Sequence, residues 1–330
     1  MSTLETNAIG KYSGNNVSVD DALNLKSYTT VQRDALTSVV GDIIYNTTDT
    51  KVQVYDGSAW NNLGGIGDSS IEYLVIAGGG AGGAGGYGGG YHGGGGGAGG
   101  YIANVTGENS GKLSNAQPLL VFTAGSYEIT VGAGGATGNS NGANGNDSRF
   151  GAISSNGGGG GGAGINGNPQ PGRDGGCGGG AGSGNAATTS KPAGTGKTGQ
   201  GFDGGAGSIN TTGYAGSGGG AGAVGTGPGG GTIAGGAGIA SSITGSSVTR
   251  STGGRVISSG SVGTVNSGDG GDGDNTGSNV GHAGGSGIVI LKFLSTKSIS
   301  IGAGLTSSTA TVGSNTVVSF TAGTGTVTFS

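Results

Sequence analysis

Three aspartates lie close together in the segment GDGGDGDN, residues 268–275. Asp269, Asp272 and Asp274 are separated mainly by glycine. Carboxylate oxygens are the ligands that Ca²⁺ prefers, and glycine permits the sharp turns that bring them around the ion. The segment departs from the EF-hand loop and from the calcium-binding nonapeptide, and it does not repeat. We therefore interpret it as a solvated acidic loop and keep calcium binding as the alternative.

The other groups that could take part in catalysis are isolated. His92 and His282 are the only histidines, and each lies among glycines. Cys177 is the single cysteine, and a nucleophile needs a neighbouring base that the sequence does not indicate. We expect the histidines in exposed loops and Cys177 in a small apolar gap. No carboxylate pair or triad emerges, so we predict that the chain is not an enzyme and needs no cofactor.

The segment AGTGKTGQG, residues 193–201, invites comparison with a phosphate-binding loop. That loop needs a glycine five residues before the GK pair, and this position holds Lys191. No apolar strand precedes the segment either. The formal net charge is −4, so the composition gives no basic surface for nucleic acid. We expect neither nucleotide nor nucleic acid as a partner.

Glycine content dictates which elements can position these residues. The chain has 90 glycines among 330 residues, and 78 of them lie in residues 78–287. Such a bias is typical of a flexible coil, which remains an alternative. However, charged residues make up only 9% of the chain and hydrophobic residues 31%. Three apolar runs also need burial and predict strands: IEYLVIA (71–77), SYEITV (126–131) and GIVILKF (287–293).

A left-handed threefold helix suits the glycine tracts better than an α-helix, in which each glycine costs about 1 kcal/mol relative to alanine. The threefold helix has three residues per turn and no internal hydrogen bonds, so its amides and carbonyls can bond to close neighbours. Ala81, Ala84 and Tyr87 are spaced three apart with only glycine between them. They would form one column while the glycines face adjacent helices. Because the tracts are short and lack a sustained Gly-X-Y repeat, we predict a polyglycine II bundle framed by β-strands and not collagen.

The ends of the chain have ordinary composition and divide it into three regions. We expect an N-terminal module for attachment or oligomerisation at 1–70, the polyglycine II bundle at 71–293 and a β segment at 294–330. In the first, Thr29 or Thr30 can cap a helix over VQRDAL, and DIIYN and KVQVYD can pair as a hairpin. A hairpin this small is marginal alone, which suggests oligomerisation. Residues 299–329 predict two to four short strands. The fold class is therefore mainly β and irregular.

Two patterns carry a resemblance. The first is EYLVIAGGGAGGAGG … GSYEITVGAGG … GGSGIVILKF, and the second is the IIYNTT … QVYDGSAW pattern within 27–65. The first resembles a glycine-rich domain of bacteriophage tail-fibre and related structural proteins, and it is similar in kind to fibre-tip adhesins that stack polyglycine II helices. The second resembles a short tail-fibre module. The resemblance implies a homotrimeric virion protein that binds a host glycan or outer-membrane protein and contacts other tail proteins.

Aromatic rings among glycines are the candidates for contact with a receptor, because they offer large contact area at a low entropy cost. The alternative is that these rings cap or pack between the helices. Polar segments at 165–174, 185–203, 209–217 and 250–261 predict the connecting loops. The candidate receptor-binding residues are Tyr87, Tyr91, His92, Tyr101, Arg173, Phe202 and Tyr214.

Other functions and the location also follow from the sequence as expectations. A structural virion component, such as a capsid decoration or connector, would use the same bundle for rigidity. An ice-binding protein would need a regular Thr or Ala face, which the irregular tracts and tyrosines disfavour. The N-terminus has no basic and apolar signal pattern, and no run is long enough to span a membrane. We therefore expect a protein made in the host cytoplasm and incorporated into the virion tail, without membrane insertion.

Overall fold

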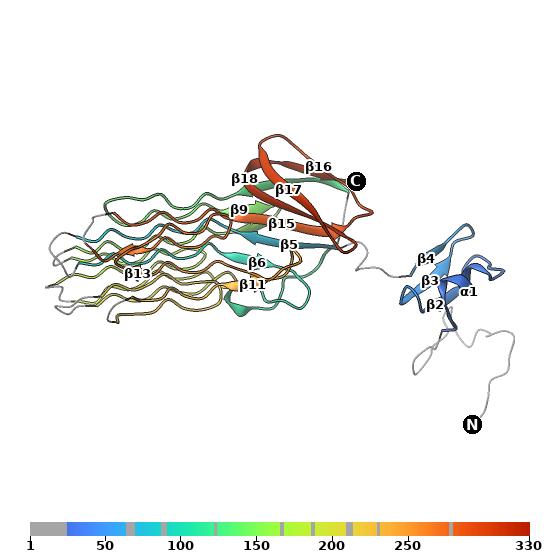
Figure 1. The fold of residues 1–330 in the computed structure, drawn as a ribbon, viewed down its shortest axis with the longest axis horizontal. Helices are drawn as coiled ribbons and strands as arrows, with labels where there is room; N and C mark the ends of the chain where they lie inside the picture. The colour runs from blue at the N-terminus through green and yellow to red at the C-terminus, as the bar shows by residue number, and fades with distance from the viewer. Residues whose placement is uncertain are drawn as a thin grey trace, which may run out of the picture. The chain divides into compact units, whose positions relative to one another are not determined.

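The computed structural model describes most of the chain (Figure 1). The described residues are 25–63, 70–86, 91–121, 124–165, 168–185, 189–208, 214–229, 232–276 and 280–330. The chain divides into two compact units, residues 1–67 and 68–330. Within the described ranges, β-strands and extended chain dominate, with one short α-helix and one 3₁₀ turn. The prediction of a mainly β protein is confirmed.

The first unit is a four-stranded sheet with one helical turn. Its elements are β1 (Ser27–Tyr28), α1 (Thr30–Asp34), β2 (Ile43–Asn46), β3 (Lys51–Tyr55) and β4 (Trp60–Asn62), with the strands in that order across the sheet. The Thr29 side chain accepts the amide of Gln32, and the Gln32 side chain accepts the amide of Thr29. This capping box confirms the predicted helix start. The predicted hairpin is also confirmed, because β2 and β3 pair antiparallel.

The described residues of the first unit bury few apolar side chains. Ile44 is its one buried apolar side chain among residues 25–63, and polar Asn46 and Gln53 are buried beside it. Val31 and Val40 are 80% and 73% exposed. Since apolar burial is the main stabilising term in folding, this sheet has little of its own to stabilise it.

The second unit contains a ten-stranded sheet. Its strands are β5 (Ser70–Ile76), β6 (Tyr101–Ala103), β7 (Leu120–Val121), β8 (Gly125–Val131), β9 (Ser148–Phe150), β10 (Ile153–Ser155), β15 (Ile288–Leu294), β16 (Ile299–Ile301), β17 (Leu305–Val312) and β18 (Asn315–Phe329). The main path is β10-β9-β8-β18-β15-β5-β6. The three apolar runs form β5, β8 and β15, as predicted. The C-terminal residues form three strands of this same sheet, within the predicted number.

The sheet curls into a nearly closed barrel. Its two end strands meet where the amide of Gly100 donates to the carbonyl oxygen of Asn156 at 2.9 Å, and the Ser155 hydroxyl donates to the carbonyl oxygen of Gly100 at 2.6 Å. Alternate side chains face one side of a strand, so the same strands can fill the interior with apolar groups. That buried cluster is Ile71, Tyr73, Val75, Ile129, Phe150, Val289, Leu291, Phe293, Val318, Phe320, Val327 and Phe329.

A hairpin covers the other face of β5 and β15. It consists of β11 (Ile239–Ser241) and β12 (Val248–Arg250). Ile239 and Ile243 from this region pack with Leu74, Ile76 and Ile290 in a second buried cluster. One further pair, β13 (Val256–Ile257) and β14 (Gly273–Asp274), runs parallel. Apolar side chains are therefore concentrated around the sheet.

The glycine tracts run side by side from the sheet to the opposite end of the second unit (Figure 1). They include residues 77–86, 93–100, 157–164, 175–182 and 216–222. The amides of residues 78–84 donate in rotation to three neighbouring segments, so that every third amide reaches the same segment. These segments are residues 140–146, 282–285 and 94–97. Residues 93–100 repeat this cycle with three other neighbours, residues 156–162, 216–219 and 268–274. A chain with three residues per turn presents its amides in this rotation.

The tracts lie too close together for side chains at most glycines. An added Cβ would overlap the carbonyl oxygen of Gly159 at Gly80, that of Gly80 at Gly96, and that of Gly96 at Gly218. Ala81 and Ala84 are buried, 0% and 3% exposed, and their amides donate to the same neighbouring segment, at Ala143 and Ser140. Glycine is therefore required here for close approach of the backbones.

Side-chain oxygens replace neighbouring carbonyls on one flank of the tracts. Three Asn or Asp residues spaced three apart use Oδ1 to accept amides spaced three apart on the adjacent tract. The pairs are Asn141 with Ala163 at 2.8 Å, Asn144 with Gly160 at 2.9 Å and Asp147 with Gly157 at 2.9 Å. Because buried amides need an acceptor, these side chains supply it on this flank. We call the tracts and the hydrogen bonds that join them the lattice.

Candidate functional site

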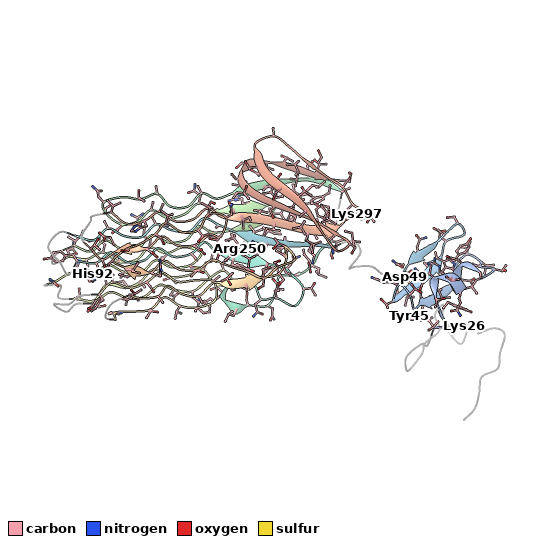
Figure 2. The ribbon with its side chains drawn as sticks, in the orientation of Figure 1. Lys26, Tyr45, Asp49, His92, Arg250 and Lys297 are labelled. Carbon is pink, nitrogen blue, oxygen red and sulfur yellow. The ribbon has the colours of Figure 1, made fainter. Side chains whose placement is uncertain are left out.

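The predicted contact residues do not all lie in one place. Figure 2 shows His92 at the end of the glycine tracts away from the sheet, and Arg250 closer to the sheet. We call the first of these regions the far end. It is defined by Gly86, Tyr91, His92, Ser183, Tyr214 and Asp274.

His92 joins several segments at the far end. Its amide donates to the hydroxyl oxygen of Ser183 at 3.3 Å, and its carbonyl oxygen accepts the amide of Ser183 at 2.9 Å. Its ring packs on the ring of Tyr214, with centroids 5.6 Å apart. The carbonyl oxygen of Tyr214 in turn accepts the amide of Ser208 at 3.0 Å. Two segments remote in sequence therefore meet on one residue.

Two more segments reach the same place. The amide of Gly93 donates to the carbonyl oxygen of Asp274 at 2.7 Å, and the amide of Gly86 donates to the carbonyl oxygen of Tyr91 at 3.0 Å. The chain on either side of residues 87–90, 186–188, 209–213 and 277–279, which the structure does not describe, thus converges at the far end. Sequence alone did not indicate which of the predicted loops belong together.

The pKa of His92 is shifted by its surroundings. Its ring is half-buried, and Nδ1 has no hydrogen-bond partner among the described residues. Burial lowers the pKa of His92, and the nearby charge of Asp274 opposes this shift. Because Nδ1 is itself buried, the half-buried ring contributes a contact surface and Nδ1 is not offered to a bound molecule.

Tyr91 and Tyr214 accompany His92 at the far end, and both are half-buried. The structure thus brings three of the predicted contact residues together. Tyr87 falls outside the described residues. The role of these residues in contact with a receptor stays a prediction.

The remaining predicted contact residues lie elsewhere. Tyr101 is 0% exposed in the cluster around the β11–β12 hairpin, and burial raises its pKa to about 12. A buried ring offers no surface to a partner, so Tyr101 belongs to the core, as the packing alternative allowed. Phe202 is half-buried with the Lys112 ammonium 5.6 Å from its ring centroid. Arg173 is exposed, and its amide donates to Gly160 within the lattice.

The interpretation of residues 268–275 as a solvated loop is wrong, because Asp272 and Asp274 are buried and all three aspartates accept hydrogen bonds from the protein. Asp272 is 4% exposed and accepts Arg255 Nη2 at 2.7 Å and the amide of Ser261 at 3.0 Å. Its hydrogen bond raises the pKa of Arg255. Asp269 accepts the amide of Thr252, and Asp274 accepts that of Thr276. Across the described ranges, no group of three or more His, Cys, Asp or Glu side chains is arranged to hold a metal ion.

Cys177 and His282 both contact the glycine tracts or the segments beside them. Cys177 is fully buried, and burial raises the pKa of its thiol to about 12. A thiol with this pKa is a poor nucleophile near neutral pH. Nδ1 of His282 lies 3.1 Å from the carbonyl oxygen of Asp272. Cys177 is buried as expected, whereas His282 is half-buried and does not lie in the exposed loop that we expected.

Comparison with known proteins gives one match. A family model for a glycine-rich domain matches residues 57–294, which include β5, the glycine tracts and β15. No curated protein and no solved structure matches the chain. In the part of the chain that the structure describes, no helix is long and apolar enough to cross a membrane.

Proposed function

This chain belongs to the glycine-rich domain family over residues 57–294, and from that premise we propose that it is a bacteriophage tail-fibre protein or fibre-tip adhesin. It binds the host cell surface through the loops of the far end. Its receptor is a glycan or an outer-membrane protein. The phage assignment rests on the resemblance of the 27–65 module and the 71–293 domain to tail-fibre sequences.

The observation that carries the proposal is the convergence at the far end. His92, Tyr91 and Tyr214 come together where the described parts of four segments converge, and these segments continue into tracts bonded backbone to backbone. A binding surface made of loops needs a rigid base to hold its contact groups in place. Aromatic rings with few rotatable bonds suit such contacts.

We further infer that the tracts are polyglycine II helices. The three-residue cycle of their amides and the absence of room for Cβ atoms support this assignment. In such a bundle, backbone hydrogen bonds and Cα–H contacts take the place of an apolar core. The buried apolar side chains are concentrated in and around the barrel-like sheet instead.

The first unit supports a role in assembly. With one buried apolar side chain in its described residues, it gains little from burial as a monomer. Exposed Val31, Val39 and Val40 would be covered in a homotrimer or against other tail proteins. We propose that this unit trimerises and attaches the protein to the virion tail.

The role proposed is binding and not catalysis. It involves no cofactor, no nucleic acid and no insertion into a membrane, and the protein would be made in the host cytoplasm before virion assembly. The competing function is a structural virion component without a receptor, such as a capsid decoration or connector. It predicts the same lattice and no interaction with the cell.

An adsorption assay tests the proposal. The purified full-length protein is added to host cells before phage that carry it, and free phage are counted over time. We expect the protein to compete for adsorption and a Tyr91→Ala/Tyr214→Ala variant to compete at least about tenfold less well, because aromatic contacts dominate such surfaces. Tyr28→Ala in the first unit is the matched control and should compete like the parent protein.

Labelling the virion distinguishes the competing function. Antibody against residues 71–293 should bind the tail in electron micrographs. Label on the head, or no competition by the parent protein, would reject the adhesin proposal in favour of a structural component.

A further inference from the structure

A polar groove lies on the flank of the glycine tracts near the sheet, away from the far end. It has a volume of about 460 Å³ and opens to solvent. Asp147 at its edge directly precedes β9, and Asn156 directly follows β10. The polar side chains that line it are Asn144, Asp147, Asn156, Asp174, Thr195 and Lys197. The volume falls in the range of small-molecule sites.

The two carboxylates of the groove are fixed in position by the backbone. Oδ1 of Asp147 accepts the amide of Gly157 at 2.9 Å, and Oδ1 of Asp174 accepts the amide of Thr195 at 2.6 Å. The hydrogen bonds that described residues make to both carboxylates reach Oδ1. Oδ2 of each therefore remains as an oriented acceptor for a ligand, at little further cost in side-chain entropy.

Hydrogen-bond donors lie in and beside the same groove. Lys197 Nζ donates to Oδ1 of Asn156 at 2.6 Å, and Gln200 Nε2 donates to the same oxygen at 3.1 Å. An ammonium has three N–H groups, so Lys197 can donate to a ligand while this bond persists. Nδ2 of Asn144 is anchored to the carbonyl oxygen of Asp174 at 3.2 Å.

Glycines complete the lining of the groove. Gly145, Gly157, Gly175 and Gly196 line it together with the polar residues. At each of these glycines the place of a Cβ is taken by backbone of a neighbouring segment, so the glycines present backbone to the groove. The C–H face of a ring-shaped ligand would rest on the Cα–H groups of the backbone, while the polar groups on the edge of the ring meet the polar side chains.

These features select one class of ligand. Two carboxylates against one ammonium disfavour an anion. The residues that line the groove include no apolar side chain to anchor a peptide. No metal-binding group of three or more acidic, His or Cys side chains occurs among the described residues. A neutral molecule with several hydroxyls on a ring edge matches both the oriented acceptors and the ammonium donor.

We propose that this groove binds neutral saccharides, with Oδ2 of Asp147 and of Asp174 accepting from ring hydroxyls and Lys197 donating to a further oxygen. The site is separate from the far end, so it does not depend on the adhesin proposal. A protein with both sites would have a saccharide contact on its flank as well as at its tip.

Saturation-transfer NMR on the full-length protein tests the site. The probes are glucose, galactose, mannose, N-acetylglucosamine and their disaccharides, followed by titration of any that bind. We expect an Asp147→Asn/Asp174→Asn variant to bind at least about tenfold more weakly, since each loses a charged acceptor. The amide oxygen can still accept the backbone amide, so the fold is retained. Asp269→Asn changes a carboxylate with the same backbone role elsewhere and should bind like the parent.

A second variant keeps the test decisive if the double variant unfolds. Thr195 is exposed at the rim, and Thr195→Trp should block the groove without entering the lattice. Loss of binding in Thr195→Trp alone would support the site. If no probe binds the parent protein at tens of millimolar, or if binding survives in every groove variant, the proposal is wrong. Loss of binding in Tyr91→Ala/Tyr214→Ala with the groove variants unaffected would assign the sugar to the far end instead.

Discussion

The amide of Gly80 donates to the carbonyl oxygen of Gly97 at 2.8 Å, while an added Cβ at Gly80 would overlap the carbonyl oxygen of Gly159. One residue thus bonds to one neighbouring tract and touches another. This arrangement repeats along the tracts, and it makes glycine necessary for backbone contact on several sides.

Gly80→Ala should destabilise the protein strongly. The methyl group has no space between the tracts and would separate them, which we expect to lower the free energy of unfolding by about 3 kcal/mol or more. Denaturant unfolding measures the change. Gly138→Ala is the matched control, because nothing lies within 4 Å of its Cβ position. Equal stability of the two variants would show that the tracts are not closely packed.

Asn141→Ala should expose one specific amide. The Asn141 side chain is the acceptor for the amide of Ala163 at 2.8 Å, and a buried amide without an acceptor costs about 1–3 kcal/mol. We expect faster hydrogen exchange at Ala163 and a modest loss of stability. Asn168 is exposed and does not belong to the set Asn141, Asn144 and Asp147, so Asn168→Ala should change neither the exchange at Ala163 nor the stability. Unchanged exchange at Ala163 in Asn141→Ala would contradict the role assigned to these side chains.

Much of this architecture could be predicted from the sequence because its signals are local. The spacing of Ala81 and Ala84 predicts the three-residue period, and the apolar runs predict β5, β8 and β15. The role of Asn141, Asn144 and Asp147 has a similar signal in the segment NGANGND, where side-chain acceptors also recur every third residue. That spacing could have been recognised beside the glycine run 157–164.

The remaining features depend on contacts between distant segments. The approach of Tyr214 and Ser183 to His92 depends on how the tracts are ordered in the bundle, and glycine carries no side-chain pattern that would encode this order. Tyr101 lies beside glycines in sequence, yet the β11–β12 hairpin buries it. The groove combines Asp147, Asp174 and Lys197 from three separate segments, so no local sequence motif could have predicted it.

Calcium should have no effect on stability. The Asp272 carboxylate already accepts hydrogen bonds from Arg255 and Ser261, and a cation would have to displace them. We expect the same melting temperature in millimolar CaCl₂ and in EDTA. A rise with calcium that Asp272→Asn abolishes would instead establish a metal site in this segment.

Stability should depend on pH through His92. Burial holds the pKa of His92 below its usual value, so in mildly acidic solution the unfolded chain binds a proton that the folded chain does not. Stability is therefore greatest above about pH 6.5 and falls as the pH drops toward the folded pKa. His92→Gln should reduce this dependence when unfolding is measured between pH 5 and pH 8, a window chosen to span about one and a half units on each side of the usual value. An identical pH profile in the variant would place the responsible group elsewhere.

Residue-resolved hydrogen exchange tests the central claim, that glycine tracts bonded backbone to backbone form the rigid base of the far end. The decisive amides are those of residues 78–84, 93–100 and 158–162, each of which donates to a neighbouring segment. The account predicts that they exchange as slowly as the amides of β5 and β15. Exchange as fast as in an unfolded peptide, with β5 and β15 still protected, would show that the tracts form no lattice and would contradict the account.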